Sequence, residues 1–544
     1  MSRRLPRRRL RFRSWQPLLL LGAVLAVAPG ARAQQPRTPP ALTADSYAPP
    51  DYIRKPAVLP PALQGEGRRL RRMSLGDALE TALRRNLSLA LQREKVVEIA
   101  SGRDLASAAF QPIIQGSAGR SVSKSPPATA QEGQAGQVLK TTQDSWVLSL
   151  LERLPTGTEL RLDSTNGRAV SGFQNAVAPE LYRAGLSASL VQPLLRDFSL
   201  DLRIQRAPVL RAEFATATAR EEARLRAMLA VKATADAYWN LVESCKSYEV
   251  NAGAHELAER QLELTRRQIA AGVLPDSDVI GVEGTVAQRE LAVARAEAQV
   301  ERAADQLRAL LNLPAEEWVD PILPVDAPSF AHVAVPFATA VERALVSRPE
   351  LKEIAFDLRR IALDLDVARN SRQPRLDLRG GVGTLGQNLD NGRTLDDTFA
   401  AQGVQWNLGA SFSWAPLGGA ARAERHRLES ALRQNGLSRE QLLVDLRGQI
   451  REALRAIDTA ERQLFASAKF RDLAERNLDV EQRRFLNGLS SNFIVAQRQA
   501  ELSQARLAEL DALIQHEKAT SDLQLATGDL LESRRLRFEV VSGG

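Results

Sequence analysis

Cysteine is nearly absent from this 544-residue chain, in which Cys245 stands alone. A single cysteine excludes an internal disulfide and any CxxC metal site. Histidine is scarce too, and its four positions lack the spacing of metal ligands, so we expect neither a metal site nor a cofactor. The histidines are His255, His332, His426 and His516.

Aromatic residues make up only 5% of the chain, whereas alanine, leucine, arginine and glutamate dominate long stretches. This composition is typical of long helices rather than of sandwiches or nucleotide-binding folds. No glycine-rich phosphate loop and no Ser/His/Asp set stands out. The acidic pair Asp396-Asp397 lies in a polar stretch, where solvated side chains are expected. The sequence therefore predicts a protein that is not an enzyme.

Long apolar runs are missing as well. The run Leu18–Ala28 has about 11 residues, which is too short to span a bilayer. It follows a basic stretch and precedes Ala31-Arg32-Ala33, which has the pattern of a signal-peptidase site. Residues 1–33 are therefore predicted to be a secretory signal peptide.

The formal net charge of +8 is confined to that leader. Met1–Ala33 holds eight arginines and no acidic residue, so the remaining chain is close to neutral. A nucleic-acid partner is therefore not expected. Residues 34–72 are rich in proline and alanine and are predicted to form an extended arm, and 531–544 a C-terminal tail.

The chain between these ends is an internal duplication, with a first repeat at 73–330 and a second at 331–530. The apolar pattern of the first repeat recurs in the second with an offset of 262, which falls to 223 and then to 216 further along. The matching landmarks are Leu75–Leu89 with Phe337–Leu351, Gln111-Pro112 with Gln373-Pro374, Gln192-Pro193-Leu194 with Ala415-Pro416-Leu417, and Gly272 with Gly488.

Each repeat is predicted to contain three helical segments in the same order. A helix of about 37 residues ends at Gln-Pro, a long helix follows the strands, and a glycine turn leads to a returning helix. Apolar residues at steps of three and four, from Leu442 to Ala468, indicate a seam of coiled-coil type. The expected helices are 74–110, 200–271 (with Pro208 kinking or delaying its start) and 276–312, then 336–372, 420–487 and 492–528.

Strands are predicted between the first two helices of each repeat. Arg375–Gly383 and Val404–Trp414 alternate apolar with polar or small residues, and a polar loop, Gly386–Gly403, separates them. This alternation fits a soluble hairpin and a lipid-facing barrel strand equally well. The first repeat is 39 residues longer here and holds an additional predicted β-hairpin at about 144–166. Its strand count is two or four, and the hairpin either widens or caps a barrel or folds outside it.

The simplest count gives about four strands per chain, which is too few to close a barrel. Because unpaired strand edges are not tolerated in lipid, several copies would have to share one barrel, and a symmetric ring is the simplest closed arrangement.

The ordered set of motifs over residues 73–530 resembles the TolC-like outer-membrane efflux protein family (the outer membrane factors). The resemblance implies a mainly α fold with a membrane β-barrel, in which a homotrimer shares 12 strands and an α-helical tunnel. It implies an outer-membrane location reaching into the periplasm, contact with outer-membrane lipid, and partners in a periplasmic adaptor (membrane fusion) protein and an inner-membrane transporter. The motifs that carry it are Ser74-Leu75 through Leu89, Gln111-Pro112, Gln192-Pro193-Leu194-Leu195, and Ala271-Gly272-Val273-Leu274 with Asp278.

The resemblance places adaptor docking and gating at the tips of the helical hairpins. It puts Asp276, Asp278 and Asn492 at the periplasmic entrance, although Asp276 is equally suited to cap a helix. Family members often carry acidic residues just after the second turn, where this chain has Ile494 and Gln497. The expected docking tips are Gly272, Val273, Leu274, Gly488, Leu489 and Ser490.

Trp406, Phe412 and Trp414 fit an aromatic membrane girdle, or packing within the protein core. The sequence thus predicts the channel subunit of a tripartite efflux or type I secretion system. The alternative is a periplasmic coiled-coil structural or adaptor protein, which leaves the paired strands unexplained. Small-molecule efflux and protein secretion both stay open.

Overall fold

The computed structural model describes residues 47–64, 69–127, 134, 137–172, 178–416 and 418–539. The predicted signal peptide and much of the predicted proline-rich arm lie outside these residues. Within the described chain, every helix falls short of the length and hydrophobicity needed to cross a membrane.

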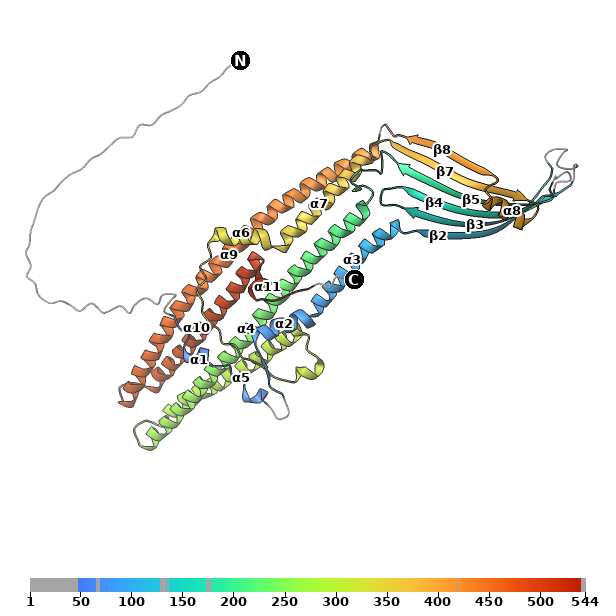
Figure 1. Ribbon diagram of the computed structural model, residues 1–544. Helices are drawn as coiled ribbons and strands as arrows, with labels where there is room; N and C mark the ends of the chain where they lie inside the picture. Colours follow the sequence, from blue (N-terminus) through green and yellow to red (C-terminus); the bar gives the residue numbers. More distant parts are fainter. Residues whose placement is uncertain are drawn as a thin grey trace, which may run out of the picture. The chain divides into compact units, whose positions relative to one another are not determined.

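Two long helices, α4 and α9, organise the two repeats (Figure 1). Each long helix packs along two shorter ones, α4 along α3 and α5, and α9 along α7 and α10. Because α4 also contacts α7 and α10, the helices lie in four neighbouring columns, in the order α3/α5, α4, α7/α10, α9. Their bounds are α3 Leu87–Ser107, α4 Ala207–Ala270, α5 Asp278–Leu311, α7 Pro349–Asn370, α9 Gly419–Leu486 and α10 Asn492–Thr527.

The first helix of each repeat is broken, where the sequence predicted a continuous helix. α2 (Leu75–Arg85) ends before Asn86, and α6 (Phe337–Ser347) ends before Arg348. Both break residues have an extended backbone, with ψ of 122°. Asn86 caps α3 by accepting hydrogen bonds from two backbone amides, and Arg348 is held out of the helical region because Pro349 follows it.

The first long helix starts at Ala207 and not at residue 200, so the predicted delay of its start by Pro208 is confirmed. Pro208 occupies its first turn, where a missing N–H costs no helical hydrogen bond. The preceding segment makes turns in which Asp197 and Leu202 adopt positive φ.

The packed interiors follow the apolar seams of the long helices. On α4, Tyr238, Leu241 and Cys245 are fully buried and share one core with Leu307 and Leu311 of α5. The predicted seam of α9 is buried against α6, α7, α10 and the arm. Its fully or nearly buried members are Leu446, Ile450, Ile457, Leu464 and Ala468.

Six strands form one antiparallel sheet in the order β2-β3-β4-β5-β7-β8. Four of them come from the first repeat, because the additional hairpin is β3–β4 and pairs between β2 and β5. The sheet therefore exceeds the four strands of the simplest count. The strands are β2 Ile113–Ser125, β3 Leu139–Arg153, β4 Glu159–Val170, β5 Glu180–Pro193, β7 Arg375–Asn388 and β8 Val404–Ser413.

The connection between β7 and β8 is more ordered than the polar loop predicted for 386–403. β7 continues to Asn388, and α8 (Asn391–Phe399) follows, with Asp390 as its N-cap. Thr398 donates a hydrogen bond to the Ala184 carbonyl of β5, 3.1 Å away. At Gly386 a Cβ would lie 2.2 Å from the Thr394 carbonyl, so only glycine allows this close approach of α8.

The described part of the N-terminal arm lies across both repeats. Ile53, in the short helix α1 (Asp51–Arg54), is fully buried beside Leu464 and Leu513 of the second repeat. A few residues later, Ala57 and Leu59 join the core of α4 and α5. The arm therefore stabilises the contact between the two repeats.

A buried carboxylate anchors the arm. Glu509 of α10 is completely inaccessible and forms an ion pair with Arg471 of α9 at 2.8 Å. It also accepts hydrogen bonds from the hydroxyls of Tyr47 and Tyr52, at 3.1 and 2.9 Å. Burial, together with the Glu509 charge, raises the pKa of both tyrosines well above its usual range, so they stay protonated donors.

Candidate functional site

The two turns at the hairpin ends have the same backbone geometry. Gly272 and Gly488 adopt positive φ of 74° and 71°, which glycine accommodates without strain. After each glycine, the next amide bonds back into the last turn, from Val273 to the Gln268 carbonyl and from Leu489 to the Arg484 carbonyl. Both hairpins thus end in the same Schellman-type turn.

The predicted tip residues are mostly exposed. Val273 and Leu489 are 68% and 77% exposed, and Leu274 is half-buried. Ser490 is held in place because its hydroxyl donates to Glu481. Phe493, which the sequence reasoning missed, is 78% exposed directly after the second turn. Large apolar side chains in solvent at both tips are a feature of protein contact sites.

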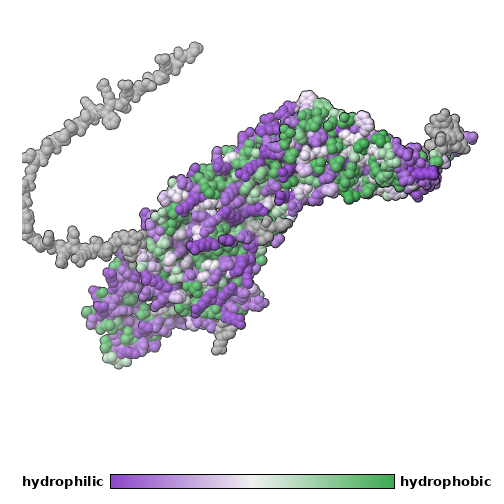
Figure 2. Space-filling model, in the orientation of Figure 1, coloured by the Kyte–Doolittle hydropathy of each residue, from purple (hydrophilic) through white to green (hydrophobic). Residues whose placement is uncertain are grey.

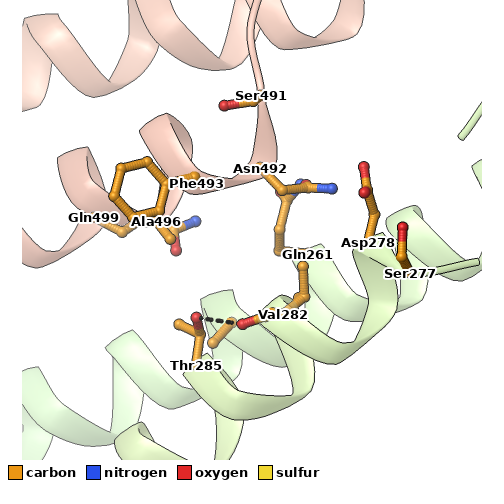
Figure 3. A pocket seen from close by; sticks show the side chains of 12 residues that line it. Gln261, Ser277, Asp278, Val282, Thr285, Ser491, Asn492, Phe493, Ala496 and Gln499 are labelled. Carbon is orange, nitrogen blue, oxygen red and sulfur yellow. Dashed lines mark hydrogen bonds between the residues drawn. The ribbon is translucent and has the colours of Figure 1, made fainter. Parts of the chain in front are cut away.

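A cavity of about 320 Å³ lies between the two hairpins behind these tips (Figure 3). Its walls come from α4 and α5 on one side and from the start of α10 on the other. Asn492 reaches across it and accepts hydrogen bonds from Gln261 at 2.6 Å and from Thr265 at 3.2 Å. The predicted entrance residue Asn492 is therefore a bridge between the repeats, and its partners on α4 were not predicted.

The two predicted acidic residues differ in their position relative to the cavity. Asp278 begins α5 and borders the cavity, whereas Asp276 is exposed in the turn. Asp276 is not the helix cap that its position suggested, because the N-cap is Ser277 and the Asp276 backbone carbonyl accepts from Val279. Among the described residues, neither aspartate forms an ion pair, so both carboxylates are available to a ligand or to a neighbouring copy.

The second hairpin contributes amides and apolar groups to this cavity. Ile494 is half-buried and Gln497 is exposed, and the lining residues of α10 are Asn492, Phe493, Ala496 and Gln499. Within the part of the chain that the structure describes, no three His, Cys, Asp or Glu residues are placed to hold a metal ion.

The six-stranded sheet has one apolar face and one polar face. Residues paired directly across neighbouring strands point to the same face, so each row of partners can be read across the whole sheet. One complete row is apolar and the next is polar or small. The apolar row is Ile114, Leu150, Leu162, Ala188, Val382 and Trp406, and the polar row is Gln115, Ser149, Asp163, Ser187, Gly383 and Gln405.

The apolar face is open to the surroundings except at the end where α8 lies over Ala184 and Gly386. Leu408, for example, is 70% exposed, and Figure 2 shows hydrophobic residues gathered over the sheet. The predicted girdle residues Trp406 and Phe412 point to this face by their register and are largely exposed. Trp414 follows the last strand and borders a hollow with Arg196 and Gly419 at the junction with α9. A contiguous exposed apolar surface of this kind marks a contact site for a protein or for lipid.

An acidic group lies between α4 and α7, away from the tips. Burial raises the pKa of Glu353 from 4.5 to about 7, and the nearby carboxylates of Glu350, Glu222 and Glu221 add to the shift. Its Oε1 is buried without a hydrogen-bond partner in the described chain. The ionised form of Glu353 is therefore disfavoured by the fold.

Comparison with known proteins gives a family match and a fold match. Residues 340–529 match the family described as outer membrane efflux protein. Nodulation protein T from Rhizobium leguminosarum bv. trifolii is 25% identical over 271 residues, which cover 49% of this chain and 56% of that protein. The matched region thus spans little more than half the length of this relative.

Solved outer-membrane channels have the same fold over most of the chain. The CmeC outer membrane channel of Campylobacter jejuni aligns with a TM-score of 0.61 and 16% identity, covering 94% of each chain. The open state of the MtrE outer membrane channel of Neisseria gonorrhoeae aligns with a TM-score of 0.58 and 17% identity, covering 84% of this chain and 89% of that one.

Proposed function

We propose that this chain, which belongs to the family of TolC-like outer membrane efflux proteins, is the outer-membrane channel subunit of an efflux or type I secretion system. Channels of this family are trimeric, work with efflux-pump components and carry out no catalysis themselves. The observation that carries the proposal is the sheet with one apolar and one polar face, joined directly to the long helices. Such a sheet suits a barrel wall between lipid and an aqueous lumen.

The edges of this sheet require further copies. β2 and β8 each have one paired neighbour in the described chain, so each presents a row of unpaired backbone groups. Unpaired backbone in hydrocarbon costs several kcal/mol per group, which only closure into a barrel avoids. We therefore assign the covering partner of the apolar face as outer-membrane lipid, and the partners of the edges as copies of this chain in a homotrimer.

The hairpin tips would then form the periplasmic end. Their exposed apolar residues, Val273, Leu489 and Phe493, offer a docking surface for a periplasmic adaptor protein. Asp276 and Asp278 would line the entrance three times over, together with the polar side chain of Asn492. An inner-membrane transporter would supply the energy, and the predicted leader at 1–33 would direct export.

The proposal is tested by the location of the protein in the cell envelope and by its oligomeric state. The protein is extracted from outer membranes in mild detergent, and its mass is measured by light scattering with correction for bound detergent. A three-chain particle that forms ion-conducting pores in planar bilayers supports the channel. A monomer or dimer released from the periplasm without detergent contradicts it and favours the structural coiled coil.

A further inference from the structure

The additional hairpin β3–β4 is built into the sheet as firmly as the other strands. Twelve residue pairs join β3 to β4, and twelve join β4 to β5, which equals the number joining β5 to β7. The apolar row passes through the hairpin without interruption, at Leu150 and Leu162. The hairpin is thus neither a cap nor an appendage of this sheet.

The turn of the hairpin is also fixed to the base of the sheet. Gly157 has a positive φ of 85°, and a Cβ there would meet Gln205 at 3.0 Å and Pro193 at 3.4 Å. Thr158 donates a hydrogen bond to Gln192. These contacts join the turn to the end of β5 and to the segment that leads into α4.

The register gives all six strands the inclination of a closed barrel. The row through Ile114, near the start of β2, meets β8 at Trp406, which lies seven residues before the end of that strand. The stagger is about six residues, or about 20 Å along the strands, over about 24 Å of sheet width. This corresponds to a tilt of about 40°, within the range of membrane barrels.

The width of the six-stranded sheet matches the width of the helical wall. Four columns at the usual spacing of 8–10 Å occupy about 32–40 Å of perimeter per chain. Six strands tilted by about 40° occupy about 38 Å, whereas four occupy only about 25 Å. With the hairpin in the wall, the barrel and the helices have similar perimeters.

We propose that three copies of this chain close a barrel of eighteen strands, in which β3–β4 lies in the membrane wall between β2 and β5. The edge strand β2 of one copy pairs with the edge strand β8 of the next. β2 leads away from α3 and β8 returns to α9, so the two run antiparallel and the apolar faces continue across the junction. The proposal rests on the trimeric channel proposed above.

The consequence is a wider outer mouth. Barrel diameter grows roughly in proportion to strand number, so eighteen strands give a backbone diameter of about 36 Å, against about 24 Å for twelve at the same tilt. The extra strands widen the duct within the barrel, which lies at the end of the molecule away from the helical hairpin tips.

Spin labels on the full-length trimer test the hairpin and the channel separately. Leu148→Cys and Ser145→Cys place labels on the apolar and polar faces of β3, and Leu408→Cys and Asn407→Cys do the same on β8. The native Cys245 is fully buried and is not expected to react. Accessibility to lipid-soluble oxygen and to a water-soluble nickel chelate is measured in lipid vesicles.

In an eighteen-stranded barrel, labels at 148 and 408 are accessible to oxygen, and labels at 145 and 407 are accessible to nickel. Equivalent backbone positions in the three copies are then about 30 Å apart, against about 20 Å with twelve strands. Two results would show that the hairpin lies outside the wall. One is that the β8 labels alternate as expected while the label at 148 is shielded from oxygen, and the other is a distance of about 20 Å between equivalent positions of the three copies. Either result makes the proposal of eighteen strands wrong but leaves the proposed channel intact. If the β8 labels also fail to alternate, the proposed channel fails as well.

Discussion

The side-chain oxygen of Asn492 accepts a hydrogen bond of 2.6 Å from the side-chain amide of Gln261. This bond connects the start of α10, in the second helical hairpin, to α4, in the first. Thr265, one turn further along α4, donates to the same oxygen. Each repeat thus holds the tip of the other through a polar contact that borders the cavity.

Replacing Asn492 with alanine is expected to loosen the tips and increase leakage through the resting channel. A hydrogen bond of this kind contributes about 1 kcal/mol, so each lost bond shifts the balance between joined and separated hairpins about fivefold. Single-channel recording in planar bilayers measures the open fraction. Gln515→Ala is the matched control, because Gln515 is exposed on the same helix and lies far from the turn. Equal open fractions in the two variants would show that the bridge does not restrain the entrance.

A charge on the apolar face of the sheet is expected to block assembly. In the proposed barrel, Leu408→Arg puts a cation into lipid, which costs about 2–4 kcal/mol per chain near the bilayer midplane. Asn407→Arg alters the neighbouring residue, which points to the polar face. The amount of trimer in outer-membrane fractions should fall several-fold for the first variant and stay near the wild-type level for the second. The reverse order would mean that the polar face meets the lipid.

Glu353 is expected to make the stability of the fold pH-dependent. Its pKa rises from 4.5 to about 7 in the folded chain, chiefly through burial. The folded state therefore favours the protonated carboxyl, and this residue lowers the free energy of unfolding as the pH rises from about 4.5 to 7, with the full loss present above 7. Allowing for partial exposure, the loss is on the order of 1–2 kcal/mol.

The measurement is the thermal unfolding midpoint of Glu353→Gln at two pH values. At pH 8.5 the variant should unfold at a higher temperature than the wild type, and at pH 4.5 most of the difference should vanish. Glu342→Gln, at an exposed position of α6, is the control and should show no such dependence. A difference of equal size at both pH values would show that Glu353 acts through packing and not through its charge.

The order of helices and strands was predictable from sequence because the internal duplication shows the same order of predicted helices and strands twice. The breaks at Asn86 and Arg348 were missed although their signals are local, an asparagine cap in one repeat and Pro349 in the other. The length of the insert indicated the hairpin β3–β4. Its place in the sheet depends on pairing with β2 and β5, which strand alternation alone does not specify.

The tip residues were predictable only as turns. Glycines at equivalent positions of both repeats indicate two turns, and the structure shows that both are of the Schellman type. The bridge from Asn492 to Gln261 joins residues 231 positions apart in the chain. The sequence around each residue does not predict contact with the other. The role of Asn492 as a bridge therefore depends on how α4 and α10 pack, which only the structure shows.

The buried pair of Arg471 and Glu509 leads to the last prediction. Arg471→Leu leaves the Glu509 carboxylate fully buried without its ion-pair partner, which typically costs about 3–5 kcal/mol. The hydroxyls of Tyr47 and Tyr52 compensate only in part, because a neutral donor offsets less of the charge. We therefore expect a large drop in the free energy of unfolding, together with faster proteolysis of the arm at 47–64.

A double variant separates the charge from the packing. Arg471→Leu with Glu509→Gln removes both charges and keeps a side-chain oxygen that accepts from the hydroxyls of Tyr47 and Tyr52, so it should recover most of the stability lost in the single variant. Arg476→Leu removes an exposed arginine from the same helix and should cost less than about 1 kcal/mol. The free energies come from denaturant titration of the detergent-solubilised protein. If the double variant is as unstable as Arg471→Leu alone, the arm is held by the shape of these side chains, and the uncompensated carboxylate is not the cause of the loss.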